Sequence, residues 1–279
     1  MSRLLLCTDL DRTLLPNGTQ PESERARKRF SQLVKCAQVT LVYVTGRHQQ
    51  LVEQGIEEYN LPQADFVIAD VGSTIYEIAE TGWHHQEIWE KIIAGDWQGK
   101  SAIELIELFD SIKEIQLQEQ SKQSTHKLSY YVSLSVDHQL ILNTMTRILE
   151  QQSIEANLIW SVDPLANIGL LDVLPASAGK RQAIEFLRQR LGFDYSETVF
   201  SGDSGNDICV LSSPIQSVLV ANADEDVREA AIKQAQVNHQ EENLYLARGN
   251  FMGMNGNYSA GILEGVVHFM PLAENWFKD

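Results

Sequence analysis

Positively charged residues are scarce in this chain. Its 279 residues include 22 lysines and arginines against 38 aspartates and glutamates, a formal net charge of −16. Such an acidic protein repels nucleic-acid phosphates and anionic membranes unless a local basic patch compensates. The one basic run that stands out, residues 24–29, has helical spacing and is typical of a solvated helix face. We therefore expect no nucleic-acid or membrane partner, and an anionic ligand would need a divalent cation and a few placed lysines or arginines.

Cysteines and long apolar runs are also few. The three cysteines, Cys7, Cys36 and Cys209, are widely spaced and lack the spacing of a zinc site or a disulfide framework. We expect them to be small buried core residues in a reducing compartment. No run of 18 apolar residues occurs, and Asp9 and Asp11 interrupt the first apolar stretch, so neither a membrane span nor a secretory signal is expected. The sequence predicts a cytoplasmic protein.

The first eighty residues alternate between strand and helix patterns. Continuous apolar runs predict strands at residues 4–7, 39–44 and 66–69, and amphipathic patterns predict helices at 21–35 and 48–59. Strand, helix, strand order favours right-handed crossovers and a parallel sheet whose strands all end at one edge. This pattern, with 43% apolar content, predicts an α/β fold with a Rossmann-like core.

The pattern changes near residue 80. Two helical and two strand-like segments follow, at residues 102–113, 128–136, 138–152 and 157–162. They are typical of a small α+β unit, and strand, loop and helix order resembling the first part returns after about residue 168. We therefore expect residues 1–79 and 170–279 to form one core and residues 80–169 to form an inserted cap.

Asp9 and Asp11 stand where the first predicted strand opens into a loop, the position at which open α/β sheets bind ligands. Carboxylates two residues apart on an extended chain point in different directions, so one can attack a reacting centre while the other transfers a proton. A solvated acidic loop would produce the same pattern. The pair therefore needs partners elsewhere in the chain.

Three further elements supply such partners. Thr45 and Gly46 end the second strand before a helix, where a hydroxyl and an N–H suit a phosphate oxygen, although turn chemistry alone explains them too. Lys180 lies in the first turn of a predicted helix, where a cation opposes the helix dipole, so either a bound anion or plain solvation accounts for it.

An oxygen-rich loop, Gly202 to Asp207, follows a predicted strand at residues 197–200. Asp203 and Asp207 are separated by Gly and Asn, which allow unusual backbone dihedral angles, and such a loop suits a hard divalent cation. Magnesium takes only one or two protein carboxylates, so Asp9 and Asp203 would suffice as direct ligands. An N-capping turn would need a less elaborate sequence.

Lys127 stands out in the insert, because the insert has far more acidic than basic residues. Alternation along the predicted strand puts Lys127, Ser129 and Tyr131 on one face. This face either contacts a ligand or is a solvent-facing strand edge, and the residues leave both readings open.

Taken together, these elements resemble the haloacid dehalogenase superfamily, whose phosphotransferases use an aspartate nucleophile. The matching motifs are Asp9-Leu10-Asp11-Arg12-Thr13, Thr45 after a strand, Lys180 opening a helix, and Gly202-Asp203-Ser204-Gly205-Asn206-Asp207. The insert resembles the α+β cap of one subclass. Arg12 departs from the pattern, which usually has Gly or Asn there, and the segment 250–258 is longer than the resemblance requires.

The chain is more closely similar to the sucrose-phosphate phosphatases and mannosylfructose-phosphate phosphatases. This similarity rests on Thr45-Gly46-Arg47, Val71-Gly72-Ser73, Lys127-Leu128-Ser129-Tyr130, Asp172-Val173-Leu174-Pro175 and Ala260-Gly261-Ile262-Leu263-Glu264. It implies a Mg²⁺-dependent phosphatase for a sugar phosphate, with sucrose 6-phosphate as the leading substrate. Mannosylfructose phosphate, glucosylglycerate phosphate, a phosphomutase and a non-catalytic sugar-phosphate sensor are the alternatives; a sensor would be expected to lack a motif aspartate.

The resemblance also implies a role for each motif residue. Asp9 would be the nucleophile and Asp11 the general acid and then base, with Thr45 and Lys180 stabilising the phosphoryl oxygens. The implied metal set is Asp9, Asp11, Asp203 and Asp207, and the implied sugar-binding set is Gly46, Arg47, Lys127 and Asn206. We expect a monomer, and an association with the synthase that makes the sugar phosphate stays open.

Overall fold

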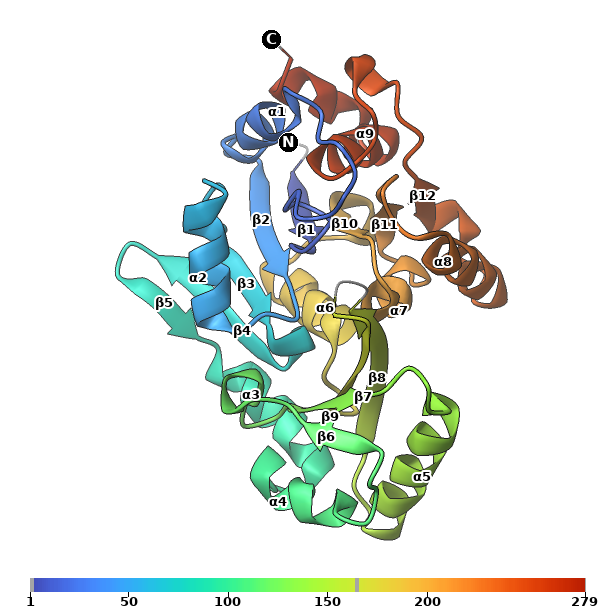
Figure 1. Cartoon of the computed structure of the whole chain (residues 1–279). Coiled ribbons are helices and arrows are strands. Elements are labelled where there is room, and N and C mark those ends of the chain that lie inside the picture. The colour runs from blue at the N-terminus through green and yellow to red at the C-terminus, as the bar shows by residue number, and fades with distance from the viewer. Residues whose placement is uncertain (1–2, 164–165, 279) are drawn as a thin grey trace.

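The computed structural model describes residues 3–163 and 166–278. An eight-stranded sheet runs in the order β12-β11-β10-β1-β2-β3-β4-β5, with β4 and β5 antiparallel and the rest parallel (Figure 1). Its strands are β1 (Leu4–Thr8), β2 (Val39–Val44), β3 (Phe66–Ala69), β4 (Thr74–Ala79), β5 (Gly82–His85), β10 (Thr198–Gly202), β11 (Gln216–Leu219) and β12 (Leu244–Leu246). This is the α/β core that the sequence predicts.

A second, antiparallel sheet has the order β6-β7-β9-β8. Its strands are β6 (Ile115–Leu117), β7 (Leu128–Val132), β8 (Ala156–Asp163) and β9 (Ile168–Pro175). The helices are α1 (Ala26–Val34), α2 (Gln49–Glu58), α3 (Glu87–Ala94), α4 (Ala102–Ile106), α5 (His138–Gln151), α6 (Lys180–Leu191), α7 (Ile208–Leu211), α8 (Glu225–Val237) and α9 (Ser259–Phe269).

Alternate residues of β1 face opposite sides of the first sheet, and both sides are buried. Leu4 and Leu6 pack in the cluster that includes residues of α1 and α9, whereas Leu5 and Cys7 pack in the cluster that includes residues of α6 and α8. Helices therefore cover both faces, which explains why the parallel strands appear in the sequence as continuous apolar runs. The third cluster joins the second sheet to α4 and α5.

The second sheet lies at the carboxyl ends of the parallel strands of the first (Figure 1). The side chain of Lys127, just before β7, reaches the backbone carbonyl of Gly46 after β2. The chain leaves the first sheet after β5, at His85, and leaves the second after β9, at Pro175. The division into a core and an inserted cap remains a proposal, with these residues as the points of passage between sheets.

Some predicted boundaries differ from those observed. The predicted helix 21–35 begins only at Ala26, because the Pro21 carbonyl accepts hydrogen bonds from the side chains of Asn255 and Asn257 and Ser23 bonds Asn255. The predicted strand 128–136 ends at Val132, and the predicted helix 102–113 is α4 followed by a short 3₁₀ turn.

The cysteine prediction is wrong in part. Cys7 is buried, but Cys36 is only partly buried and Cys209 is exposed. In the short helix α7 the apolar residues Val210 and Leu211 take the buried positions. Among residues 3–163 and 166–278, no helix combines the length and apolar character needed to cross a membrane.

Candidate active site

The polar motifs converge because β1, β2, β3 and β10 are parallel neighbours that end at one edge. The start of α6 lies at the same edge because the backbone of Gly179 packs closely against Gly72. A Cβ on Gly72 would lie 2.2 Å from the carbonyl carbon of Gly179, so only glycine allows this approach. The φ angle of Gly72 is +98°, a further reason for glycine. Lys180 is thereby fixed over the end of β1.

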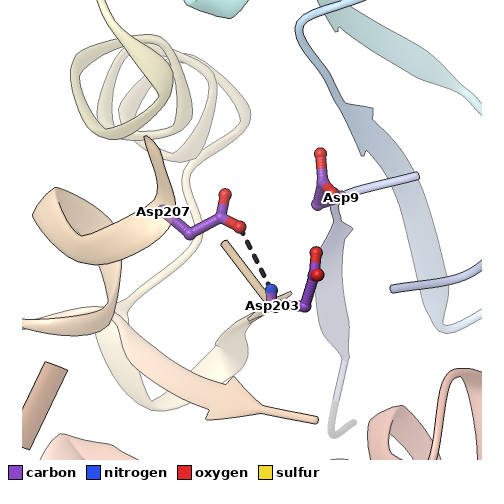
Figure 2. Close-up of side chains that lie close together, drawn as sticks. All are labelled: Asp9, Asp203 and Asp207. Atoms are coloured by element: carbon purple, nitrogen blue, oxygen red, sulfur yellow. Dashed lines mark hydrogen bonds between the residues drawn. The ribbon is translucent and has the colours of Figure 1, made fainter. Parts of the chain in front are cut away.

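Three carboxylates form the centre of the site (Figure 2). Asp9, Asp203 and Asp207 each offer an oxygen, and these atoms lie within 4.8 Å of one another. Asp207 is fixed because its Oδ2 accepts hydrogen bonds from the backbone N–H groups of Asp203 and Ser204, at 3.1 Å each. The Thr13 hydroxyl donates to Asp203 Oδ1 at 2.9 Å and lies 3.4 Å from Asp9 Oδ2. All three aspartates are buried.

Lys180 neutralises part of this cluster. Its Nζ donates to Asp9 Oδ1 at 2.9 Å, to Asn206 Oδ1 at 2.8 Å and to Asp207 Oδ1 at 2.7 Å. Only 1% of the residue is exposed, so the alternative of a solvated lysine is excluded. Burial alone would lower the pKa of Lys180, but the charges of Asp207 and Asp9 outweigh burial and hold that pKa above its usual range.

The metal-free carboxylates are reluctant to ionise together. Burial, and then repulsion by Asp207, raises the pKa of Asp203 to about 7. Burial also raises the pKa of Asp9 well above its ordinary value, with Asp207 and Asp203 adding to the effect and Lys180 opposing it. A bound divalent cation would relieve this repulsion.

The oxygen ligands present fit a magnesium ion. Asp203 Oδ2 is buried and has no hydrogen-bond partner among the described residues, although the Arg12 guanidinium lies 3.4 Å away, and Asp9 Oδ2 has only the long contact from Thr13. Hard carboxylate oxygens of this kind are the ligands that magnesium takes. Both oxygens of Asp207 already accept hydrogen bonds, so Asp207 fits the role of orienting its neighbours better than that of a direct ligand.

Asp11 is not part of this group of three carboxylates and has partners of its own. Arg47 donates to it through Nε at 2.8 Å and through NH2 at 2.6 Å, and Asn17 donates at 2.8 Å. Burial would raise the pKa of Asp11, but the Arg47 and Asn17 hydrogen bonds and the Arg47 charge outweigh it and lower that pKa. Arg47, which the resemblance assigns to the sugar, is here the partner of the expected acid and base.

The remaining predicted residues lie around this centre. Thr45 is fully buried after β2, the strand hydrogen-bonded to β1, and its hydroxyl accepts from the backbone N–H of Arg47. Asn206 orients Lys180 through Oδ1. Lys127 is 4% exposed, so the prediction's alternative of a solvent-facing edge is wrong. Its Nζ lies 3.4 Å from the Gly46 carbonyl oxygen and 3.9 Å from Asp70 Oδ1.

Arg12, the residue that departs from the family pattern, contacts both Asp203 and Asp224. Its Nε lies 3.4 Å from Asp203 Oδ2, and its two terminal nitrogens each lie 3.1 Å from the Asp224 carboxylate. The φ angle of Arg12 is +58°, which explains why Gly or Asn is usual at this position. The loop 250–258 supports the same region, because Asn222 accepts from the backbone N–H of Tyr258 and donates to the Arg12 carbonyl.

A family model described as sucrose-6F-phosphate phosphohydrolase matches residues 2–270. The chain belongs to this family. It is 50% identical over 276 residues to a chain of Nitrosococcus oceani named only as a HAD-like hydrolase, a match covering 99% of this chain and 74% of the other. It is 30% identical over 281 residues to sucrose-phosphatase 1 of Nicotiana tabacum, covering 96% of this chain and 59% of that protein. Mannosylfructose-phosphate phosphatase of Agrobacterium fabrum is 26% identical, with 95% and 96% covered.

Solved structures confirm the fold. The sucrose-phosphatase of Synechocystis, solved in complex with sucrose and phosphate, matches 96% of this chain and 98% of its own with a TM-score of 0.77 at 24% identity. A haloacid dehalogenase-like hydrolase of Bacillus subtilis matches 96% and 92% with a TM-score of 0.63 at 18% identity. The resemblance drawn from the motifs is confirmed, and family membership makes the chain a phosphoric monoester hydrolase of the sugar phosphatase type.

Thr13, Asn17 and Asp70 are among the residues of this region that had no predicted role. Thr13 links Asp9 to Asp203, Asn17 holds Asp11, and Asp70 faces Lys127. Thr13 stands inside the first motif and Asp70 stands at the end of a parallel strand, so both positions carried a signal. Nothing in the local pattern around Asn17 indicates its contact.

Proposed function

We propose that the protein hydrolyses a disaccharide phosphate, with sucrose 6-phosphate as the leading substrate, in a Mg²⁺-dependent reaction through an aspartyl-phosphate. The observation that carries this proposal is the position of Lys127. Lys127 lies just before β7 of the second sheet, and its ammonium group contacts the loop after β2. This loop neighbours the end of β1, where Asp9 lies. A charged donor there suits the hydroxyl groups of a sugar attached to a phosphate held near Asp9.

Asp9 would attack phosphorus, forming an oxygen–phosphorus bond while the bond to the sugar oxygen breaks. Lys180 touches Asp9 Oδ1, so it would hold the nucleophile in place and stabilise charge on the transferring phosphoryl group, with Thr45 on the neighbouring strand. Mg²⁺, held by Asp9 and Asp203 with the backbone carbonyl of Asp11, would supply neutralising charge between the carboxylate and the phosphoryl oxygens.

Asp11 would protonate the leaving sugar oxygen and then remove a proton from the water that hydrolyses the intermediate. The hydrogen bonds from Arg47 favour the ionised carboxylate, which opposes the first step, and they occupy its oxygens, which obstructs both steps. We infer that sugar hydroxyls compete for Arg47 when substrate binds. Asp11 would then be released toward the reacting oxygen, and water would be excluded as the two sheets close on the substrate.

Mannosylfructose phosphate is the second candidate substrate, because the relative named for it is matched over 96% of its own length. Glucosylglycerate phosphate and a phosphomutase reaction stay as further alternatives. All four motif aspartates are present, which disfavours a non-catalytic sensor. A monomer in the cytoplasm, and an association with the synthase that supplies the substrate, remain predictions.

A panel of sugar phosphates, scored by release of inorganic phosphate with Mg²⁺, tests this proposal. We expect sucrose 6-phosphate to give the highest kcat/KM and the Asp9→Asn variant to give none. A phosphomutase would instead yield an isomerised sugar phosphate without free phosphate. Turnover confined to simple aryl phosphates would contradict a sugar substrate.

A further inference from the structure

Asp70 has no part in the chemistry described above, yet its carboxylate is poorly satisfied. It follows β3 at the same sheet edge as Asp9, and only 4% of the residue is exposed. Thr74 donates to its Oδ2 at 3.1 Å. Its Oδ1 is buried without a hydrogen-bond partner among the described residues. Because an unsatisfied buried carboxylate oxygen costs free energy, its retention needs an explanation.

Lys127 supplies a charge to this oxygen but no hydrogen bond. The distance of 3.9 Å from Nζ to Asp70 Oδ1 exceeds hydrogen-bond range, and the contact from Nζ to the Gly46 carbonyl is long, at 3.4 Å. An ammonium group carries three donors. The unsatisfied acceptor Asp70 Oδ1 and the unused N–H donors of Lys127 therefore lie next to each other at the junction of the two sheets.

The backbone fixes Asp70 firmly at this place. Asp70 and Val71 have φ angles of +52° and +59°, and a β-branched residue such as Val71 rarely adopts that region. The strain is held by hydrogen bonds from Asp70 N to the Arg47 carbonyl and from Val71 N to the Thr45 carbonyl, at 3.1 and 3.0 Å. Such strain is commonly stored at functional sites. The segment joins Asp70 directly to the loop that includes Thr45.

We propose that Asp70 and Lys127 together bind one hydroxyl group of the sugar leaving group. The hydroxyl donates to Asp70 Oδ1 and accepts from Lys127 Nζ, which satisfies both. This inference rests on the proposed function and deepens it by naming the class of leaving group. Because the Asp70 and Lys127 pair has no net charge, it selects phosphate esters of neutral polyols. It disfavours a leaving group that carries a carboxylate, because that carboxylate would be repelled by the Asp70 charge.

The test uses Asp70→Asn, because asparagine is isosteric and tolerates a positive φ. We compare kcat/KM for sucrose 6-phosphate, for 6-phosphogluconate, whose leaving group carries a carboxylate, and for p-nitrophenyl phosphate. The kcat/KM for sucrose 6-phosphate should fall by about tenfold or more, the scale of a lost charge-assisted hydrogen bond. The kcat/KM for 6-phosphogluconate should rise, because the positive charge of Lys127 is no longer balanced by Asp70. The kcat/KM for p-nitrophenyl phosphate should stay unchanged.

Glu90→Gln is the matched control, because it removes one carboxylate that faces His85 and His126 instead. It should leave the ratio of the three substrates unchanged. Thermal unfolding of each variant shows whether the fold persists. If Asp70→Asn is unstable, the double variant Asp70→Asn with Lys127→Met restores the charge balance, and the proposal expects it to stay defective on sucrose 6-phosphate.

Two results would overturn the inference alone: an Asp70→Asn enzyme with an unchanged preference between sucrose 6-phosphate and 6-phosphogluconate, or full recovery in the double variant, which would make Asp70 a mere counter-ion. Failure of the proposed function looks different. In that case the wild-type enzyme would turn over p-nitrophenyl phosphate but no sugar phosphate, and both proposals would fall together.

Discussion

Two buried lysines reach the active-site edge, and their surroundings differ sharply. Lys180 has oxygen partners at 2.7, 2.8 and 2.9 Å, one for each of its three N–H donors. Lys127 is almost as deeply buried, but its nearest oxygen partners lie at 3.4 and 3.9 Å. Burial alone therefore does not reveal what a lysine does. A saturated ammonium group is a fixed part of the chemical centre, whereas an unsaturated one has capacity left for a ligand.

The difference follows from how each lysine is positioned. Lys180 opens α6, which Gly72 holds against the end of the first sheet, so its partners come from elements packed together in one core. Lys127 comes from the second-sheet side and meets partners across the junction of the two sheets. We therefore propose that the Lys180 region performs the chemistry and that the Lys127 region selects the substrate, and the following changes test that division.

The largest effect should come from Asp9→Asn. An amide is isosteric with the carboxylate but cannot attack phosphorus, so kcat should fall by several orders of magnitude with every substrate. Phosphate release measures the loss, and an unchanged unfolding transition would confirm that the fold survives. Substantial turnover by this variant with Mg²⁺ present would sink the covalent mechanism.

Removal of the metal should also stop the hydrolysis of sugar phosphates and aryl phosphates alike. A chelator should abolish phosphate release, Mg²⁺ should restore it, and Ca²⁺ should inhibit, because its longer bonds and larger ligand number favour a bidentate grip on Asp9. Mg²⁺ should also raise the midpoint of thermal unfolding, since it binds the folded carboxylate cluster. Equal rates with the two cations would contradict the proposed geometry.

Lys180→Ala should cost about 10²- to 10³-fold in kcat on both a sugar phosphate and an aryl phosphate, the scale of a lost electrostatic stabiliser. It should also lower the free energy of unfolding, because Asp9 and Asp207 lose their counter-charge. Arg181→Ala removes the same charge from the next residue of α6 and serves as the control. A loss confined to the sugar phosphate would argue against the assigned role.

Lys127→Ala should weaken transition-state binding of a disaccharide phosphate by about 1 to 3 kcal/mol, the cost of a lost charge-assisted hydrogen bond. Lys113→Ala, which removes an exposed lysine elsewhere, should change nothing. Steady-state kinetics of the two variants side by side give the comparison. An equal loss in both variants would show a general charge effect.

The smallest effect should be on the pH dependence of the free energy of unfolding of the metal-free protein. Folding raises the pKa of Asp203 from 3.8 to about 7, so between those values the folded state binds a proton that the unfolded state releases. The contribution of Asp203 to the free energy of unfolding should therefore fall as pH rises through this window. Denaturant titrations in chelator should show a flatter pH profile for Asp203→Asn than for the wild type. Identical profiles would refute the raised pKa.

Much of this arrangement is predictable from sequence, for a physical reason. The strands β1, β2 and β3 are buried on both faces, so their apolar runs are continuous and their ends are clear. Since parallel strands end at one edge, the motifs after them must converge. Asp9 and the loop from Asp203 to Asp207 follow two such strands, β1 and β10, and the structure brings them together. Lys180 follows β9 of the second sheet, so its place beside them was implied by the family resemblance and not by the strand ends.

The pairings between long polar side chains could not be predicted. The contact between Arg47, which the resemblance assigns to the sugar, and Asp11 was not predicted, nor was that between Arg12 and Asp224, 212 positions along the chain. Such contacts depend on which rotamers the folded surroundings allow, and local spacing carries no information about them. Likewise, β9 was expected to resume the pattern of the core, yet it pairs with β7 and β8, because a strand pattern does not specify its neighbour.

The most direct test of the division between the two lysines is one ratio: kcat/KM for sucrose 6-phosphate over that for p-nitrophenyl phosphate, measured in wild type, Lys180→Ala and Lys127→Ala. We expect Lys180→Ala to lower both values and leave the ratio nearly unchanged, because both substrates share the phosphoryl group. We expect Lys127→Ala to lower the ratio by lowering only the sugar value. A Lys127→Ala enzyme whose ratio equals that of the wild type would contradict the account.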